Sequence, residues 1–147
     1  MSLFENNVAA IPAINRCYKR GLQSLGTDSV KVVLKHPRKC EGSVNLDECL
    51  KAALPDENRW DYMFSYKDKV YFVEVHPAQT SEVRIMLRKL DWLKNWLQTQ
   101  APSIEQQKAP NAFIWIASGR TAILPTSPQH RLLIQNGLKP MSLLQLS

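Results

Sequence analysis

The chain has 147 residues, of which 44% are hydrophobic and 22% charged, and a formal net charge of +6. This length predicts one domain, residues 1–147, with a buried core, and the composition excludes a disordered protein. Its apolar stretches are much shorter than the roughly 20 residues of a membrane helix. Because residues 1–7 lack the basic start and apolar centre of a signal peptide, we expect a cytoplasmic protein.

The positive charge is concentrated in the first third of the chain. Between Arg16 and Lys39 the chain has seven basic residues and a single acid, Asp28. This pattern indicates either a binding face for nucleic-acid phosphates or a solvated basic surface. The seven residues are Arg16, Lys19, Arg20, Lys31, Lys35, Arg38 and Lys39.

The cysteines do not indicate a disulfide framework. Cys17, Cys40 and Cys49 are odd in number, and no CxxC pair supports a zinc site. We therefore expect three reduced cysteines that contribute to packing.

In chain order, the first predicted element is a helix over residues 11–25. Pro12 suits its first turn and Gly26 its C-terminal cap. A short strand over residues 30–34 and a second helix over residues 45–54, ended by Pro55, follow it. The first helix rests on apolar residues at three- and four-residue steps, namely Ile11, Ile14, Tyr18, Leu22 and Leu25.

Two apolar runs, residues 60–66 and 70–76, are separated only by Lys67-Asp68-Lys69 and predict a β-hairpin. If Lys67-Asp68 is a two-residue turn, Asp61 lies opposite Glu74, and His76 points to the same side as Glu74. A three-residue loop would put Asp61 on the other face. Both hairpin faces carry large apolar residues, which is typical of a sheet that is covered on both sides.

Residues 81–97 predict the longest helix. Besides its core stripe, this helix carries a second apolar line, Ile85, Trp92 and Trp96. We expect these side chains to be buried by the C-terminal segment or by a second subunit in a homodimer. A loop over residues 98–110, a buried strand over 111–117, a helix over 128–136 capped by Gly137 and a strand over 138–146 complete the chain.

The hairpin and the helix after it resemble the core of the PD-(D/E)xK nuclease superfamily, the restriction-endonuclease-like fold. In that family an Asp opens one strand, a Glu-x-Lys tripeptide ends the next strand, and a helix follows. Here Trp60-Asp61 stands where Pro-Asp is common, and Phe72-Val-Glu-Val-His76 stands at the strand end. Over residues 8–118 the expected helix, strand, hairpin, long helix and strand follow the family order. His76 occupies the lysine position.

The resemblance implies an α/β fold with a central mixed sheet and helices on both faces, and a Mg²⁺- or Mn²⁺-dependent DNA endonuclease. Asp61 and Glu74 would hold the ion, together with the carbonyl of Val75. His76 would act as general base in place of the lysine, or Lys89 in the following helix would replace it. The family also has an upstream glutamate, for which Glu41 and Glu48 are candidates.

The remaining implied contacts are with phosphates of the substrate. Two other interpretations stay open: a decayed nuclease fold that acts as a nucleic-acid- or protein-binding module, and an unrelated α/β fold. The predicted nucleic-acid-binding residues are Arg16, Lys19, Arg20, Lys35, Arg38, Lys39, Arg84, Arg88 and Arg120.

Overall fold

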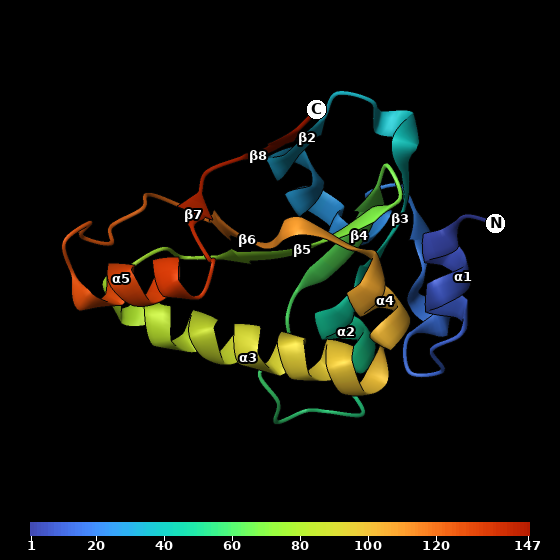
Figure 1. Ribbon diagram of the computed structural model, residues 1–147, viewed down its shortest axis with the longest axis horizontal. Coiled ribbons are helices and arrows are strands. Elements are labelled where there is room, and N and C mark those ends of the chain that lie inside the picture. Colours follow the sequence, from blue (N-terminus) through green and yellow to red (C-terminus); the bar gives the residue numbers. More distant parts are fainter.

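The computed structural model describes residues 1–147 as an α/β fold around one six-stranded mixed sheet (Figure 1). The strand order is β1-β3-β4-β5-β6-β7. Strands β1, β3, β4 and β5 pair antiparallel, and β5, β6 and β7 pair parallel. Their bounds are β1 Lys19–Arg20, β3 Cys40–Asn45, β4 Tyr62–Tyr66, β5 Lys69–His76, β6 Lys108–Ala117 and β7 Pro140–Met141.

The α-helices cover one face of this sheet, and the main hydrophobic core lies between them and the strands (Figure 1). They are α1 Leu3–Ala9, α2 Leu46–Leu50, α3 Val83–Gln100, α4 Pro102–Gln107 and α5 Pro128–Gln135. None of them is both long enough and apolar enough to cross a membrane.

The second face of the sheet is covered without α-helices. The 3-10 helix η2 Gln23–Lys31 and a parallel pair of strands, β2 Val32–Leu34 and β8 Leu144–Leu146, lie over it. A smaller core around Phe64 and Ile116 separates them from the sheet. The α/β class and the mixed sheet are thus confirmed, but the second face carries 3-10 turns and a strand pair where helices were expected.

The hairpin prediction is confirmed in its two-residue form. Tyr66 pairs with Lys69, and the turn residues Lys67 and Asp68 have φ values of 51° and 63°. Two positive φ values are typical of a type I′ turn, whose twist matches that of the flanking strands. The last pair of the ladder is Tyr62 with Val73, so the next position in register sets Asp61 against Glu74.

The predicted helix over residues 11–25 is wrong. The segment contains the 3-10 helix η1 Asn15–Cys17, the edge strand β1 and the start of η2. Ile11 and Ile14 belong to the main core, whereas Leu22 and Leu25 pack in the smaller core on the other face. The chain crosses the sheet edge between them, so residues that resembled one helical stripe face two separate cores.

Strand β3 was missed because its sequence, Cys-Glu-Gly-Ser-Val-Asn, has little of the β-branched and aromatic content of a strand. Gly42 is required within it, since a Cβ atom there would lie 2.3 Å from the ring of Tyr18. The predicted strand and helix on either side are shorter than expected and appear as β2 and α2. The side chain of Asn45 caps α2 by accepting a hydrogen bond from the amide of Glu48.

The predicted loop over residues 98–110 is also wrong. Helix α3 continues to Gln100, and Pro102 then occupies the first turn of α4, where a missing N–H costs nothing. Strand β6 begins at Lys108 and contains an irregularity at Asn111, whose φ is 53°. In the C-terminal segment α5 is confirmed, but the predicted final strand is divided into β7, in the large sheet, and β8, beside β2.

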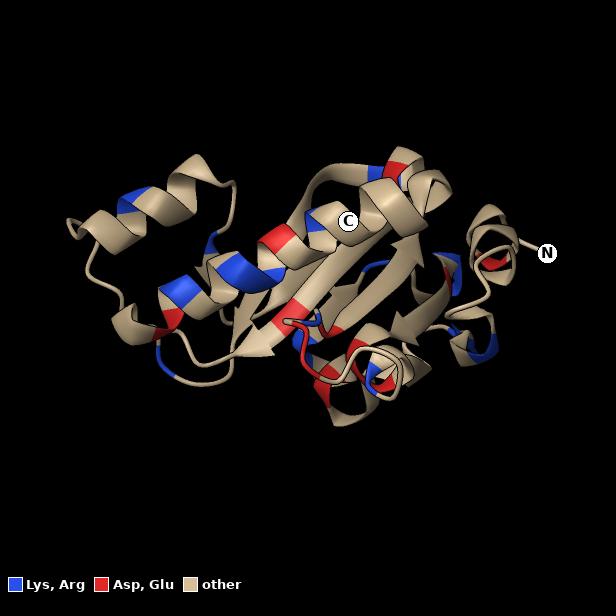
Figure 2. Cartoon of the chain, turned by 90° about the horizontal axis from the view of Figure 1, so that it is seen from below, with Lys and Arg blue, Asp and Glu red and all other residues tan.

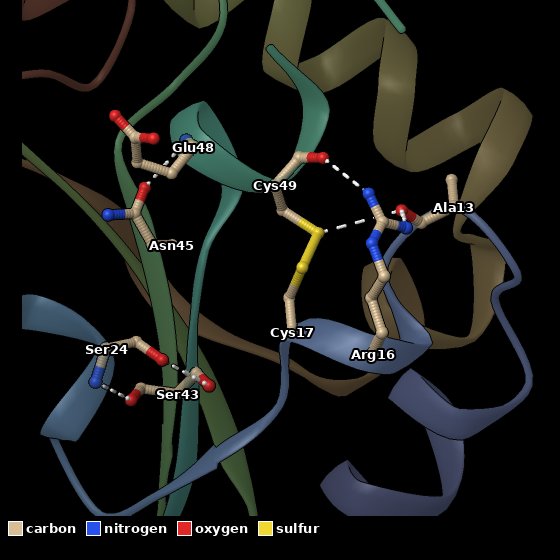
Figure 3. Close-up of a disulfide and its surroundings, with 8 residues drawn as sticks. All are labelled: Ala13, Arg16, Cys17, Ser24, Ser43, Asn45, Glu48 and Cys49. Carbon is tan, nitrogen blue, oxygen red and sulfur yellow. Dashed lines mark hydrogen bonds between the residues drawn. A yellow bond between two sulfur atoms is a disulfide. The ribbon is translucent and has the colours of Figure 1, made fainter. Parts of the chain in front are cut away.

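Cys17 and Cys49 form a disulfide, which corrects the prediction of three reduced cysteines (Figure 3). Only Cys40 is free, and it is buried. The bond joins η1 to α2, and Arg16 adds a second connection by donating hydrogen bonds to the carbonyls of Ala13 and Cys49. Two segments 32 residues apart are therefore held together beside the start of β4.

The second apolar line of α3 is only partly buried. Trp96 is 4% exposed and Ile85 is 38% exposed, while Trp92 is half-buried. Trp96 is buried within the single chain and lines a pocket together with Leu54 and Glu57 of the segment between α2 and β4, so no second subunit is needed to bury it. The homodimer remains a prediction.

Candidate functional site

Asp61 and Glu74 are connected by two crossed hydrogen bonds. The amide of Asp61 donates to Oε1 of Glu74 at 2.9 Å, and the amide of Val75 donates to Oδ2 of Asp61 at 3.1 Å. Strand β4 begins only at Tyr62, so the side chain of Asp61 takes the place of a backbone acceptor for Val75. The hairpin register therefore brings both carboxylates to the face that α3 covers.

Lys89 of α3 completes this group. Its Nζ lies 2.6 Å from Oε2 of Glu74, whose side chain is 1% exposed. Lys89 itself retains 20% exposure, so its ammonium group is at the border of the solvent. A Lys, a Glu and an Asp from three successive elements thus meet at the ends of β4 and β5.

His76 lies next to this group but is directed elsewhere. Its Nε2 is 2.9 Å from Oε2 of Glu82, and its Nδ1 is 3.9 Å from Oε2 of Glu74. Glu82 precedes α3 in the 3-10 helix η4 Thr80–Glu82. The closest cation to Glu74 is therefore Lys89, and His76 is engaged mainly by Glu82.

The charges of the site are not balanced. Burial, followed by repulsion from Asp61, raises the pKa of Glu74 to about 8 despite the opposing effect of Lys89. Burial also raises the pKa of Asp61, against the amide of Val75 and the charge of Lys89. Burial alone would lower the pKa of Lys89, but the charge and hydrogen bond of Glu74 outweigh it and raise the pKa. When both acids are ionised, two carboxylates share one ammonium group, so a further cation would stabilise that state of the site.

The oxygens present fit a hard divalent ion. Asp61 uses only Oδ2 in its hydrogen bond, and the carbonyl of Val75 faces the same side of β5 as its amide, beyond the start of β4. Both oxygens of Glu74 accept one hydrogen bond and keep further lone pairs. No group of three or more His, Cys, Asp or Glu side chains is placed to hold a metal. One or two carboxylates with several waters are the usual Mg²⁺ ligands.

The start of α2 supports Asp61 from the other side. The amides of Leu46 and Asp47 donate to the carbonyl oxygen of Asp61, at 2.8 and 3.4 Å. Asp47 pairs with Arg59, and its charge, together with that of Asp28, adds to the raised pKa of Asp61. The burial of Asp61 between β5 and α2 remains the largest cause of its raised pKa.

The candidate upstream glutamates lie in different places. Glu41 accepts a hydrogen bond from Ser65, toward the turn of the hairpin, and is remote from Asp61. Glu48 is exposed in the first turn of α2, near the carbonyl of Asp61. Of the two, only Glu48 is at the end of the sheet that holds Asp61 and Glu74.

The predicted nucleic-acid-binding residues are not gathered around these carboxylates. Lys35, Arg38 and Lys39 lie near the hairpin turn, since the carbonyl of Lys39 accepts from the amide of Lys67. From there to Glu74 the strand spans roughly 17 Å at 3.3–3.4 Å per residue. Three others share the carboxylate end or the helix above it, namely Arg84, Arg88 and Arg120. The remaining three, Arg16, Lys19 and Arg20, lie on η1 and the edge strand β1.

Sequence reasoning named Lys89 only as an alternative and missed Glu82, Asp47 and Asp28. Lys89 could have been placed from the helical period, because Met86, Leu90 and Leu93 fix which side of α3 faces the sheet. Comparisons of the chain with known protein families, with curated proteins and with solved structures found no match.

Proposed function

We propose that this protein is a divalent-metal-dependent nuclease of the PD-(D/E)xK type that hydrolyses DNA phosphodiesters. In this proposal Asp61, Glu74 and the carbonyl of Val75 hold a Mg²⁺ or Mn²⁺ ion. Lys89, and not His76, supplies the positive charge that the family places at the end of the strand.

The observation that carries the proposal is the contact between Lys89 and Glu74. The ammonium group of Lys89 lies 2.6 Å from the carboxylate of Glu74, although Lys89 is 15 residues further along the chain and belongs to another element. The crossed hydrogen bonds place Asp61 beside the same carboxylate. The order of elements agrees with this proposal from the hairpin onward, because the β4–β5 hairpin is followed by α3 and then β6. Before the hairpin it differs, since the expected helix over residues 11–25 is absent and α2 stands between β3 and β4.

The residues would divide the chemistry as follows. A divalent cation held by the two carboxylates would supply charge stabilisation at the phosphate and would orient a water. Because Glu74 raises the pKa of Lys89, Lys89 stays protonated and donates hydrogen bonds to the developing negative charge. Asp61 and Glu74 would fix the position of this chemistry, since hydrogen bonds of the hairpin hold both side chains and α2 holds the backbone of Asp61.

The decayed-fold alternative is favoured by one observation. Glu74 is 1% exposed, and each of its oxygens already accepts a hydrogen bond from the protein. An internal ion pair of this kind holds three elements together without any metal. In that case Lys89 has a structural role, and the same fold serves as a binding module.

A cleavage assay with plasmid and single-stranded DNA separates the two candidates. Asp61→Asn and Lys89→Ala should each lower the rate by at least about 10²-fold in Mg²⁺ or Mn²⁺, the size of a lost charge-stabilising group. His76→Ala should retain most of the activity, because His76 pairs mainly with Glu82.

The matched control is Asp91→Asn, which neutralises an exposed carboxylate on the same helix as Lys89. It should cleave like the parent protein. Absence of cleavage by the parent in either metal would favour the decayed fold. Full loss in His76→Ala with activity kept in Lys89→Ala would assign the role to His76.

A further inference from the structure

We propose that Arg84, Arg88 and Trp92 of α3 bind a single strand of nucleic acid, with one unpaired base stacked on the indole of Trp92. The substrate class rests on the proposed function, whereas the strand-binding step can be measured without cleavage. These residues follow one another at four-residue steps, and we call them the α3 stripe.

Trp92 is held in a fixed orientation. One face of its ring stacks on Trp96, with centroids 6.0 Å apart and ring planes inclined by 12°. Its Nε1 donates a hydrogen bond to Oε1 of Glu57 at 2.8 Å. Trp92 nevertheless remains half-buried and not fully covered, so part of the ring faces the solvent. A restrained aromatic ring loses little entropy when a base stacks on it.

The stripe leads directly to the candidate site. Trp92 is three residues beyond Lys89, which is about 4.5 Å along the helix axis and on the same side of α3. Lys89 contacts Glu74, so a base on Trp92 would belong to a nucleotide close to the phosphate at that carboxylate. A pocket of about 330 Å³ lies next to Trp96 and is bordered by Asn95 and Thr99 of α3 and by Glu57.

The charge of the stripe suits a phosphate backbone. Arg84 and Arg88 are exposed, and neither forms an ion pair within the chain. Figure 2 shows basic segments along the N-terminal half of α3 and acidic segments on α2 and the loop that follows it. Free guanidinium groups beside an accessible aromatic ring are the combination that binds single strands without sequence preference.

A single strand is favoured over a duplex for a physical reason. In a duplex each base is already stacked on its neighbours and paired, so its face is closed to a protein side chain. A tryptophan on a rigid helix surface can gain stacking energy only from an unpaired base. A substrate with a single-stranded segment next to the cleaved bond therefore fits this surface best.

The test measures the affinity for a fluorescent oligodeoxythymidylate of about 12 nucleotides by anisotropy, in EDTA to prevent cleavage. Trp92→Leu should weaken binding by roughly 5- to 150-fold, the range for one lost stacking contact, and Trp92→Phe should restore most of it. Arg88→Gln should weaken binding and lower its salt dependence. Lys139→Gln, distant along the chain, serves as the control and should bind normally.

Several results would overturn the proposal. The first two are equal affinities of Trp92→Leu and the parent, and tighter binding of a duplex than of a single strand of the same length. The third is a parent protein that binds no oligonucleotide. The fourth is a parent protein that forms a dimer which Trp92→Leu dissociates. If the parent binds the strand through Trp92 but never cleaves it with metal, the proposed nuclease function fails and the binding surface stands. If the Trp92→Leu variant cleaves DNA as fast as the parent, the proposed binding surface fails and the nuclease function stands.

Discussion

The two ends of the β4–β5 hairpin are built in different ways. At the closed end, two consecutive residues, Lys67 and Asp68, form the turn, and their side chains are exposed. At the open end, Asp61 and Glu74 depend on contacts with α2 and α3. The closed end is local in the sequence, whereas the open end brings together residues up to 28 positions apart, from Asp61 to Lys89.

The difference explains why the open end is the better place for chemistry. A turn between two adjacent residues stabilises itself and leaves its side chains in water. The open end keeps two carboxylates and one ammonium group partly or fully out of water, with raised pKa values for both acids. Such arrangements cost stability unless they are supported from outside, and they cluster at functional sites.

The largest expected effect concerns the disulfide that ties η1 to α2 beside the open end. Replacing both of its cysteines, Cys17→Ser with Cys49→Ser, should lower the free energy of unfolding by roughly 3–4 kcal/mol, because a loop of 32 residues is no longer closed. Urea denaturation measures this change. Cys40→Ser, at the buried free cysteine, is the control, and reducing agent should destabilise it as much as the parent.

The turn at the closed end and the pairing of Asp61 with Glu74 at the open end could be predicted from the sequence. The register of Asp61 and Glu74 could be predicted because both apolar runs are adjacent and the connection has only two residues. The elements that cover the two faces of the sheet could not be predicted in the same way. Ile11 and Leu25 fit one helical period by their spacing, but they pack in two different cores. The role of Lys89 also needed the direction of α3, and the disulfide needed the tertiary proximity of η1 and α2.

Removing a lysine ammonium group should destabilise the protein much more at the open end than at the closed end. Lys89→Met leaves Glu74 buried without its partner and should cost roughly 3 kcal/mol, the lower part of the range for broken buried pairs, because Lys89 is 20% exposed. Lys67→Met at the closed end should change stability by less than about 0.5 kcal/mol. Equal effects of the two substitutions would contradict the comparison.

The open end should also make stability depend on pH. The pKa of Glu74 is about 8 in the folded protein against an ordinary value of 4.5, so folding favours its protonated form. This stabilisation is complete below about pH 4.5 and is lost as the pH rises through about 8. Thermal unfolding of the metal-free protein should show a decline between about pH 5 and 8.5 that is smaller in Glu74→Gln. An unchanged slope in this variant would exclude Glu74 as its source.

The smallest effect is expected at the closed end. Asp68 has a φ of 63°, and glycine at this position of a type I′ turn is preferred. Asp68→Gly should therefore stabilise the protein by about 0.5–1 kcal/mol and leave metal binding unaltered. Urea denaturation and a metal titration of the same variant measure both. A loss of metal affinity would show that the two ends are coupled.

The central claim is that Asp61 and Glu74 form one divalent-metal site next to Lys89. Calorimetric titration with Mn²⁺ and Mg²⁺ should find one ion per chain, with binding that tightens as the pH rises toward about 8 because metal and proton compete for Glu74. Asp61→Asn should weaken it by more than about 100-fold, since it removes the negative charge of a direct ligand, whereas Asp91→Asn should not. Failure of the parent protein to bind either ion, or equal affinity in Asp61→Asn, would contradict the claim.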